Sequence, residues 1–154
     1  MFGLGCHVTD SVVAILGRTE MVTPHSRSSS PLKDGFPDNQ TAVLKYPSAI
    51  VTVRSVLVEW DGGARRQFVV CGTKGTMDIR PIEHPEARLT LSAAHGEYNA
   101  GRQTLTFPKG RGRYDGDFEV LAKVILVEKA LEFSPAHDRA VHETFLRASG
   151  LPVE

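Results

Sequence analysis

His7 and Asp10 lie close to the start of the sequence and have types and a spacing that could do chemistry. Residues three apart on a helix share one face, so these two side chains would lie near each other. A histidine can act as an acid, a base or a ligand near neutral pH, and a carboxylate can orient it. Asp10 could also serve only the helix, by interacting with the helix dipole. The pattern leaves the catalytic and the structural interpretation open.

A second group of polar residues lies near the end of the chain, at His137, Asp138 and His142. Two histidines five apart do not suit a metal site, which needs a spacing of four on one helix face. Asp138 lies in the first turn of a predicted helix, where a negative charge compensates the helix dipole. Cys71 and the serines of 26–30 have no recognisable base beside them, so nothing indicates nucleophilic catalysis. We expect no metal site in this sequence.

Two glycine-rich segments resemble phosphate-binding loops, at residues 3–8 (GLGCHV) and 110–115 (GRGRYD). A dinucleotide-binding fingerprint needs a preceding strand and a third glycine, and Val8 and Asp115 stand at the third position. The basic residues of 109–113 are followed at once by acidic ones, which favours a solvated loop over a nucleic-acid contact. We therefore expect that this chain binds no cofactor by itself and no nucleic acid.

Composition limits the class of protein. The chain has 154 residues, 18 Lys and Arg against 18 Asp and Glu, and 41% hydrophobic residues, which is enough for one domain with a real core. A net charge of zero indicates neither a polyanion-binding protein nor a disordered acidic tail. Two distant cysteines exclude a disulfide-dense secreted scaffold. No apolar stretch approaches the roughly 20 residues of a membrane span, and no targeting signal is visible, so a cytoplasmic location is the default expectation.

The elements that must position these residues are mainly strands in the middle of the chain. Alternating and β-branched patterns predict strands at 21–23, 41–46, 50–60, 65–71, 76–82, 87–93 and 103–107. Asp61-Gly62-Gly63 predicts a tight hairpin between the strands 50–60 and 65–71. Gly72-Thr73-Lys74-Gly75 predicts a second tight turn.

Helices are predicted at both ends of the chain. The first covers 7–16 and ends at Gly17, and the last begins with Ser134 as N-cap and Pro135 at the first helical position. Another begins near Phe118, capped by Asp115 or Asp117. The predicted fold is α+β: an open, mostly antiparallel sheet of about six or seven strands with helices packed on one face.

Both faces of the strand 50–60 are partly apolar. One face of this predicted strand carries Ile50, Thr52, Arg54, Val56, Val58 and Trp60, and the residues between them share the other. One face should meet the helices, and the other could meet a second subunit. Arg54 and Tyr114 are further candidates for a ligand pocket, because both are polar groups near the end of a predicted element.

An ordered set of short motifs resembles a known family. The motifs are residues 5–10 (GCHVTD), 70–76 (VCGTKGT), 114–118 (YDGDF), 137–138 (HD) and 143–150 (ETFLRASG), spread over nearly the whole chain. Each motif alone is weak, but in this order they resemble the C-terminal domain of the Gfo/Idh/MocA family of NAD(P)-dependent oxidoreductases. The resemblance implies that residues 1–154 form a single substrate-binding and oligomerisation domain. It also implies that the Rossmann domain, which binds NAD or NADP, lies outside this sequence, because the chain is a truncated, split or misannotated reading frame.

The resemblance implies a role for His7. Members of the family act mostly on sugars, inositols and related polyols, and the histidine of their Asp-x-Gly-x-His motif contacts the reacting hydroxyl. His7 matches that histidine and Gly5 its glycine, whereas the aspartate position falls on Gly3. The resemblance further implies a homo-oligomer through the open sheet face and a Rossmann-domain partner.

Two alternatives stay open beside that interpretation. Because Gly3 has no carboxylate, the chain could be a non-catalytic ligand-binding or assembly module that kept the sheet and lost the chemistry. An unrelated α+β ligand-binding domain is the other alternative, since fold alone does not determine function.

Overall fold

A computed structural model describes residues 5–32, 34–108 and 116–153, and it confirms the predicted α+β class. In this part of the chain seven strands form two open antiparallel sheets, and four helices accompany them. The chain divides into two compact units, one made of Met1–Trp60 with Leu131–Glu154 and one made of Asp61–Ala130. Neither of the sheets includes a parallel pair of strands among these residues.

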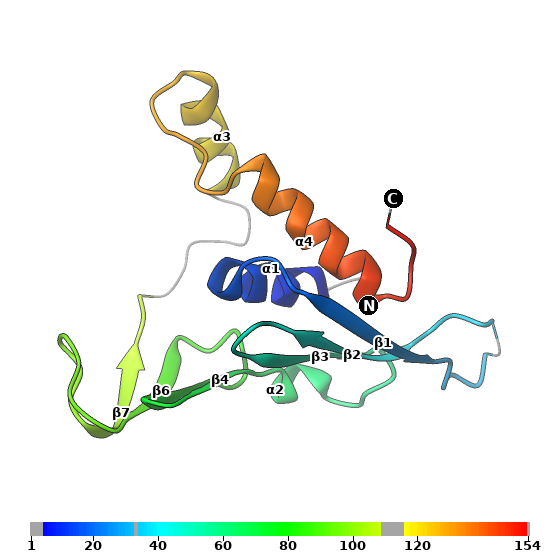
Figure 1. The fold of residues 1–154 in the computed structure, drawn as a ribbon, viewed down its shortest axis with the longest axis horizontal. Coiled ribbons are helices and arrows are strands. Elements are labelled where there is room, and N and C mark those ends of the chain that lie inside the picture. Colours follow the sequence, from blue (N-terminus) through cyan, green and yellow to red (C-terminus); the bar gives the residue numbers. More distant parts are fainter. Residues whose placement is uncertain (1–4, 33, 109–115, 154) are drawn as a thin grey trace. The chain divides into compact units, whose positions relative to one another are not determined.

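The first unit is a three-stranded sheet covered on one face by two helices. Its strands are β1 (Met21–Arg27), β2 (Asn39–Lys45) and β3 (Ile50–Val56), in the order β1-β2-β3. The helices α1 (Gly5–Leu16) and α4 (Pro135–Ala148) lie side by side over this sheet (Figure 1). The first and last helices of the chain therefore share one layer.

The core of this unit follows from the alternation of β2. Gln40, Ala42 and Leu44 are buried beneath the helices, whereas the residues between them lie on the other face. Val12 and Val13 of α1, Val53 of β3 and Ala148 of α4 complete the buried apolar set, together with Tyr46. Burial of this set drives the packing of α1 and α4 on the sheet.

The helix ends of the first unit form as the sequence predicts. Gly17 has a φ of 75°, and its N–H donates to the carbonyl of Val13, which closes α1. The Ser134 hydroxyl accepts a hydrogen bond from the N–H of His137, and Pro135 takes the first helical position of α4.

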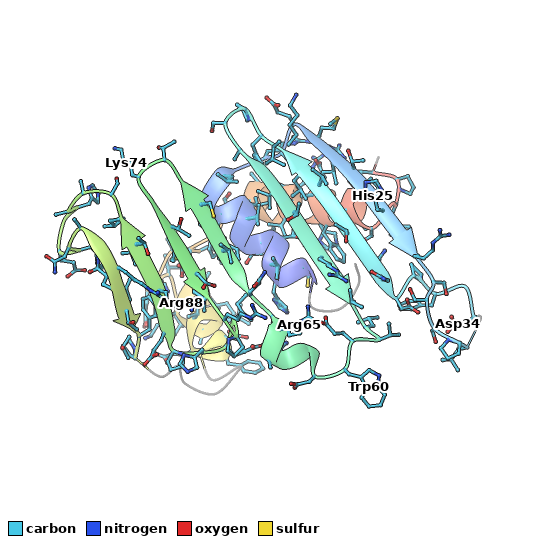
Figure 2. All side chains as sticks on the ribbon, turned by 90° about the horizontal axis from the view of Figure 1, so that it is seen from below. His25, Asp34, Trp60, Arg65, Lys74 and Arg88 are labelled. Atoms are coloured by element: carbon cyan, nitrogen blue, oxygen red, sulfur yellow. The ribbon has the colours of Figure 1, made fainter. Side chains whose placement is uncertain are left out.

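The second unit is a four-stranded antiparallel meander. Its strands are β4 (Phe68–Gly72), β5 (Gly75–Ile79), β6 (Glu86–Leu91) and β7 (Gly101–Thr106), in the order β4-β5-β6-β7. The short helix α2 (Gly62–Arg65) precedes them, and α3 (Asp117–Ile125) follows them. The predicted turn is confirmed, since Gly72 pairs with Gly75 and Lys74 lies at its tip (Figure 2).

The predicted hairpin around Asp61-Gly62-Gly63 is wrong. β3 pairs only with β2 and β4 only with β5 within the described chain, and β3 ends at Val56 rather than Trp60. Asp61, not a glycine, takes the positive φ of 51°, and the two glycines begin α2. The 11 residues between β3 and β4 contain a helical turn, which a two-residue hairpin loop cannot include.

Two boundaries also differ from the predicted ones. β1 continues through Pro24 to Arg27, because β1 is an edge strand, where the missing N–H of proline costs no ladder bond. Gly116 is the N-cap of α3. The alternative cap Asp115 lies outside the described residues, and Asp117 is instead the first residue of the helix.

Candidate functional site

His7 is held at the start of α1 with its side chain exposed. Gly5, Thr9, Val12 and Val13 are the buried residues of α1, and their helical spacing leaves His7 on the opposite side. The Thr9 hydroxyl donates to the carbonyl of Gly5 at 2.9 Å inside the unit, which fixes the first turn. An imidazole displayed in this way can donate or accept a proton from a ligand that reaches the helix end.

Asp10 binds His137 of α4, not His7. Its Oδ1 atom lies 2.7 Å from Nε2 of His137, and since a carboxylate only accepts, the ring nitrogen donates. The His137 side chain is 15% exposed, and its ring stacks on Phe133 with a centroid separation of 4.5 Å. The carboxylate that could have oriented His7 therefore joins the two helices.

A second polar contact holds α4 against the turn that follows α1. Glu143 is buried, and its carboxylate accepts from Arg18 and, at 2.8 Å, from Nε of Arg139. The hydrogen bond from Arg139 and the charges of Arg18, Arg139 and Arg147 hold the pKa of Glu143 below its ordinary value, although burial opposes this. These ion pairs and the Asp10–His137 bond fix the helix layer that displays His7.

Arg54 lies away from His7. Antiparallel pairing places it beside Thr41 of β2, on the face of the sheet that the helices leave open. We call this the open face; its residues are Met21, Thr23, His25 and Arg27 of β1, Asn39, Thr41, Val43 and Lys45 of β2, and Ile50, Thr52, Arg54 and Val56 of β3. Figure 2 views this face with the helices behind it, and His25 is labelled on β1. His7 and Arg54 thus belong to opposite sides of one sheet.

Tyr114, the other predicted pocket residue, and Gly3, at the motif's aspartate position, lie outside the described residues. So does the basic run of 109–113. The structure therefore describes His7 and Arg54 alone among the residues selected from the sequence for substrate binding.

The described residues do not fit a nicotinamide cofactor. All their strand pairs are antiparallel, so this part of the chain forms no βαβ crossover to present a helix end to a pyrophosphate. Nor do three or more His, Cys, Asp or Glu side chains gather as a metal site in the ranges the structure describes.

Sequence reasoning missed the partners of Asp10 and Glu143. His137 follows Asp10 by 127 residues and Glu143 follows Arg18 by 125, so no local spacing reveals either contact. One indirect signal was present: a glutamate and a histidine on the inner side of a helix need polar partners there.

The sequence matches one known domain family. Residues 1–78, half of the chain, match the profile of the GFO/IDH/MocA C-terminal domain. A comparison with curated proteins finds no match. Among the described residues, no helix combines the length and the apolar character that a membrane span requires.

Solved structures of oxidoreductases share the fold. Biliverdin reductase from Synechocystis sp. PCC 6803, in complex with biliverdin and NADP+, has a TM-score of 0.72 at 18% identity, over 98% of this chain and 46% of its own. An NAD binding oxidoreductase from Klebsiella pneumoniae has a TM-score of 0.65 at 16% identity, over 96% and 46%. The WlbA dehydrogenase from Bordetella pertussis, in complex with NADH and UDP-GlcNAcA, has a TM-score of 0.67 at 12% identity, over 99% and 45%. The chain spans slightly less than half the length of each.

Proposed function

Since the chain belongs to the family of GFO/IDH/MocA C-terminal domains, we propose that it is the substrate-binding and oligomerisation part of an NAD(P)-dependent oxidoreductase. The substrate class we assign is a sugar, an inositol or a related polyol. One observation carries the proposal: nearly the whole chain aligns with less than half of each similar oxidoreductase. The chain acts as one such domain, and a Rossmann-type partner domain supplies the cofactor.

His7 is the residue we assign to substrate contact. Its exposed imidazole stands at the start of α1, where it can hydrogen-bond a substrate hydroxyl and take its proton. Asp10 is already bonded to His137, and we assign the hydrogen bonding of the His7 ring to a substrate hydroxyl. The nucleotide-sugar complex of the WlbA dehydrogenase supports the sugar class, whereas the biliverdin reductase is in complex with another kind of molecule.

A ligand-binding experiment tests the substrate class. Saturation-transfer NMR on the 154-residue chain, with myo-inositol, glucose, a UDP-sugar and biliverdin as probes, should give signals for at least one hydroxyl-rich probe. His7→Ala should remove those signals. His95→Ala is the matched control, because it removes the same side chain from an exposed position of the second unit. Binding of biliverdin alone would contradict the sugar or polyol assignment.

The apolar end of the open face, around Met21 and Ile50, is the surface we assign to self-association. Met21 and Ile50 are 53% and 76% exposed, and the pairing of both with Lys45 places them in one cross-strand row. These exposed apolar side chains, with Val43 in the next row, are our support for an interaction surface on this face. Light scattering should show an oligomer that a Met21→Ser/Ile50→Ser double variant dissociates. Leu32→Ser, at an exposed leucine on a loop, should leave it intact.

A non-catalytic assembly module is the second candidate, and Gly3 favours it because glycine offers no carboxylate at the motif position. Enzyme activity distinguishes the oxidoreductase domain from the assembly module. If the chain is the oxidoreductase domain, then after it is joined to its nucleotide-binding domain, His7→Ala should lower kcat about 10²-fold. A reconstituted protein that forms the oligomer but shows no turnover with any probe would support the assembly module.

A further inference from the structure

The open face is chemically divided along its strands. At one end, Met21 and Ile50 flank Lys45. At the other end, two rows of residues are paired across the three strands. One row is His25, Thr41 and Arg54, and the other is Arg27, Asn39 and Val56. Cross-strand neighbours have Cβ atoms about 5 Å apart, so the polar side chains of these two rows lie together. We call His25, Arg27, Asn39, Thr41 and Arg54 the basic end.

A depression of about 240 Å³ marks the basic end. It is lined by His25, Ser26, Arg27, Asn39 and Thr41, and Arg54 stands beside Thr41. Pockets for drug-sized ligands measure about 300–1,000 Å³, so this one fits a single small group better than a whole cofactor. β1 and β3 are two strand spacings apart, about 10 Å, so arginines on both can lean over β2 towards one ligand.

The charges at the basic end are unbalanced. The sequences of β1, β2 and β3 contain no Asp or Glu. Asp38, which directly precedes β2, is buried, and its oxygens accept from the N–H groups of Ser29 and Ser30. Within the described ranges, no carboxylate forms an ion pair with Arg27 or Arg54. Arg88 of β6, in contrast, is paired with Asp78.

We propose that the basic end is a binding site for a phosphate group. Two guanidinium groups can grip phosphate oxygens in bidentate fashion, and the amide of Asn39, the hydroxyl of Thr41 and the ring of His25 add further donors. This site is distinct from His7, which lies on the other side of the sheet. The phosphate is either free inorganic phosphate or the phosphoryl group of a small metabolite, since both present the same oxygens.

Amide NMR titration of the unmodified chain tests the site directly. Inorganic phosphate should shift the amide signals of residues 25–27, 39–41 and 54 in a saturable way, and added salt should weaken the effect. Glycerol 3-phosphate, run in parallel, separates the sources: tighter binding of the ester assigns a metabolite, and equal or weaker binding assigns free phosphate. Absence of saturable shifts, or equal binding of acetate, would overturn the phosphate site.

Charge variants with a matched control give the second test. Arg54→Ala and Arg27→Ala should each weaken phosphate binding about tenfold, the effect of one charge-assisted hydrogen bond. Lys45→Ala removes the same charge from the same face, two rows from Thr41, and should leave the affinity unchanged. An equal loss in Lys45→Ala would show only general attraction of anions to the face, and would refute the site. Ile50→Ser should keep phosphate binding, so failure of self-association and failure of this site are distinguishable.

Discussion

Nε2 of His137 lies 2.7 Å from Oδ1 of Asp10, and this bond joins the last helix of the chain to the first. The His137 ring is 15% exposed and also stacks on Phe133, so it is fixed on two sides. Asp10 is thereby directed towards α4, although the sequence pattern alone would pair it with His7, one turn away. Asp10, although it lies at helical spacing from His7, thus holds α1 and α4 together.

Replacement of His137 by Ala should destabilise the first unit by about 1–3 kcal/mol, because it leaves Asp10 without its donor and removes the stacked ring. Urea unfolding followed by circular dichroism measures the loss. His142→Ala, at an exposed position of the same helix, is the control and should change stability little. Equal midpoints for the two variants would contradict a stabilising role for the bond.

The Glu143→Gln variant should show a weaker dependence of its unfolding free energy on pH than the wild-type protein. The pKa of Glu143 is lowered by the hydrogen bond from Arg139 and by the charges of Arg18 and neighbouring arginines, so the folded state binds this proton less tightly than the unfolded chain. The contribution is therefore complete above the ordinary value of 4.5 and is lost as the pH falls through the folded pKa.

Urea midpoints measured from about pH 7 down to about pH 3 test this sign. The wild-type protein should exceed Glu143→Gln in stability at the upper end, and the gap should close at the lower end. Glu20→Gln, at an exposed glutamate, is the control. A gap that widens with acid would contradict the assignment.

Asp38 closes the loop between β1 and β2, because its two carboxylate oxygens accept from the N–H groups of Ser29 and Ser30 at 2.8 and 2.6 Å. Asp38→Ala should cost about 1–3 kcal/mol and expose both amides to hydrogen exchange. Asp38→Asn keeps one acceptor oxygen, so its stability should lie between that of the wild-type protein and that of Asp38→Ala. Asp34, which accepts from the nearby N–H of Phe36 in an exposed part of the loop, supplies the control variant Asp34→Ala.

Gly75 leaves no room for a side chain. A Cβ atom there would lie 2.3 Å from the carbonyl oxygen of Thr90, so Gly75→Ala must push β5 away from β6. We expect a loss of about 1–3 kcal/mol in the second unit. Gly72→Ala, at the other end of the same turn, meets backbone only at 3.6 Å and should be tolerated. Thermal unfolding of both variants makes the comparison, and similar midpoints would refute the clash.

Signals that act within a few residues predicted the local structure well. Gly17, Ser134 with Pro135, and the Gly72–Gly75 turn each end or begin an element where the sequence places it. The physical reason is that a positive φ, a cap hydroxyl or a fixed proline ring acts on its own neighbours.

Features that depend on distant residues were not predictable from such signals. The glycines after Asp61 suit a hairpin, yet β3 and β4 take other partners, which only the packing of each sheet determines. The Asp10–His137 contact requires that α1 and α4 meet. Of the candidate site, His7 could be selected, whereas the separation of Arg54 from it depended on which sheet face the helices cover.

The division of the chain has a consequence for its synthesis. The second unit is one continuous segment, residues 61–130, so it can fold as soon as this segment has emerged from the ribosome. The first unit, in contrast, needs residues 131–154, which include α4. Until those residues emerge, the buried side of β2 has only α1 to cover it. The growing chain then exposes apolar surface to which chaperones bind. Premature termination after Ala130 would therefore give a product prone to aggregation.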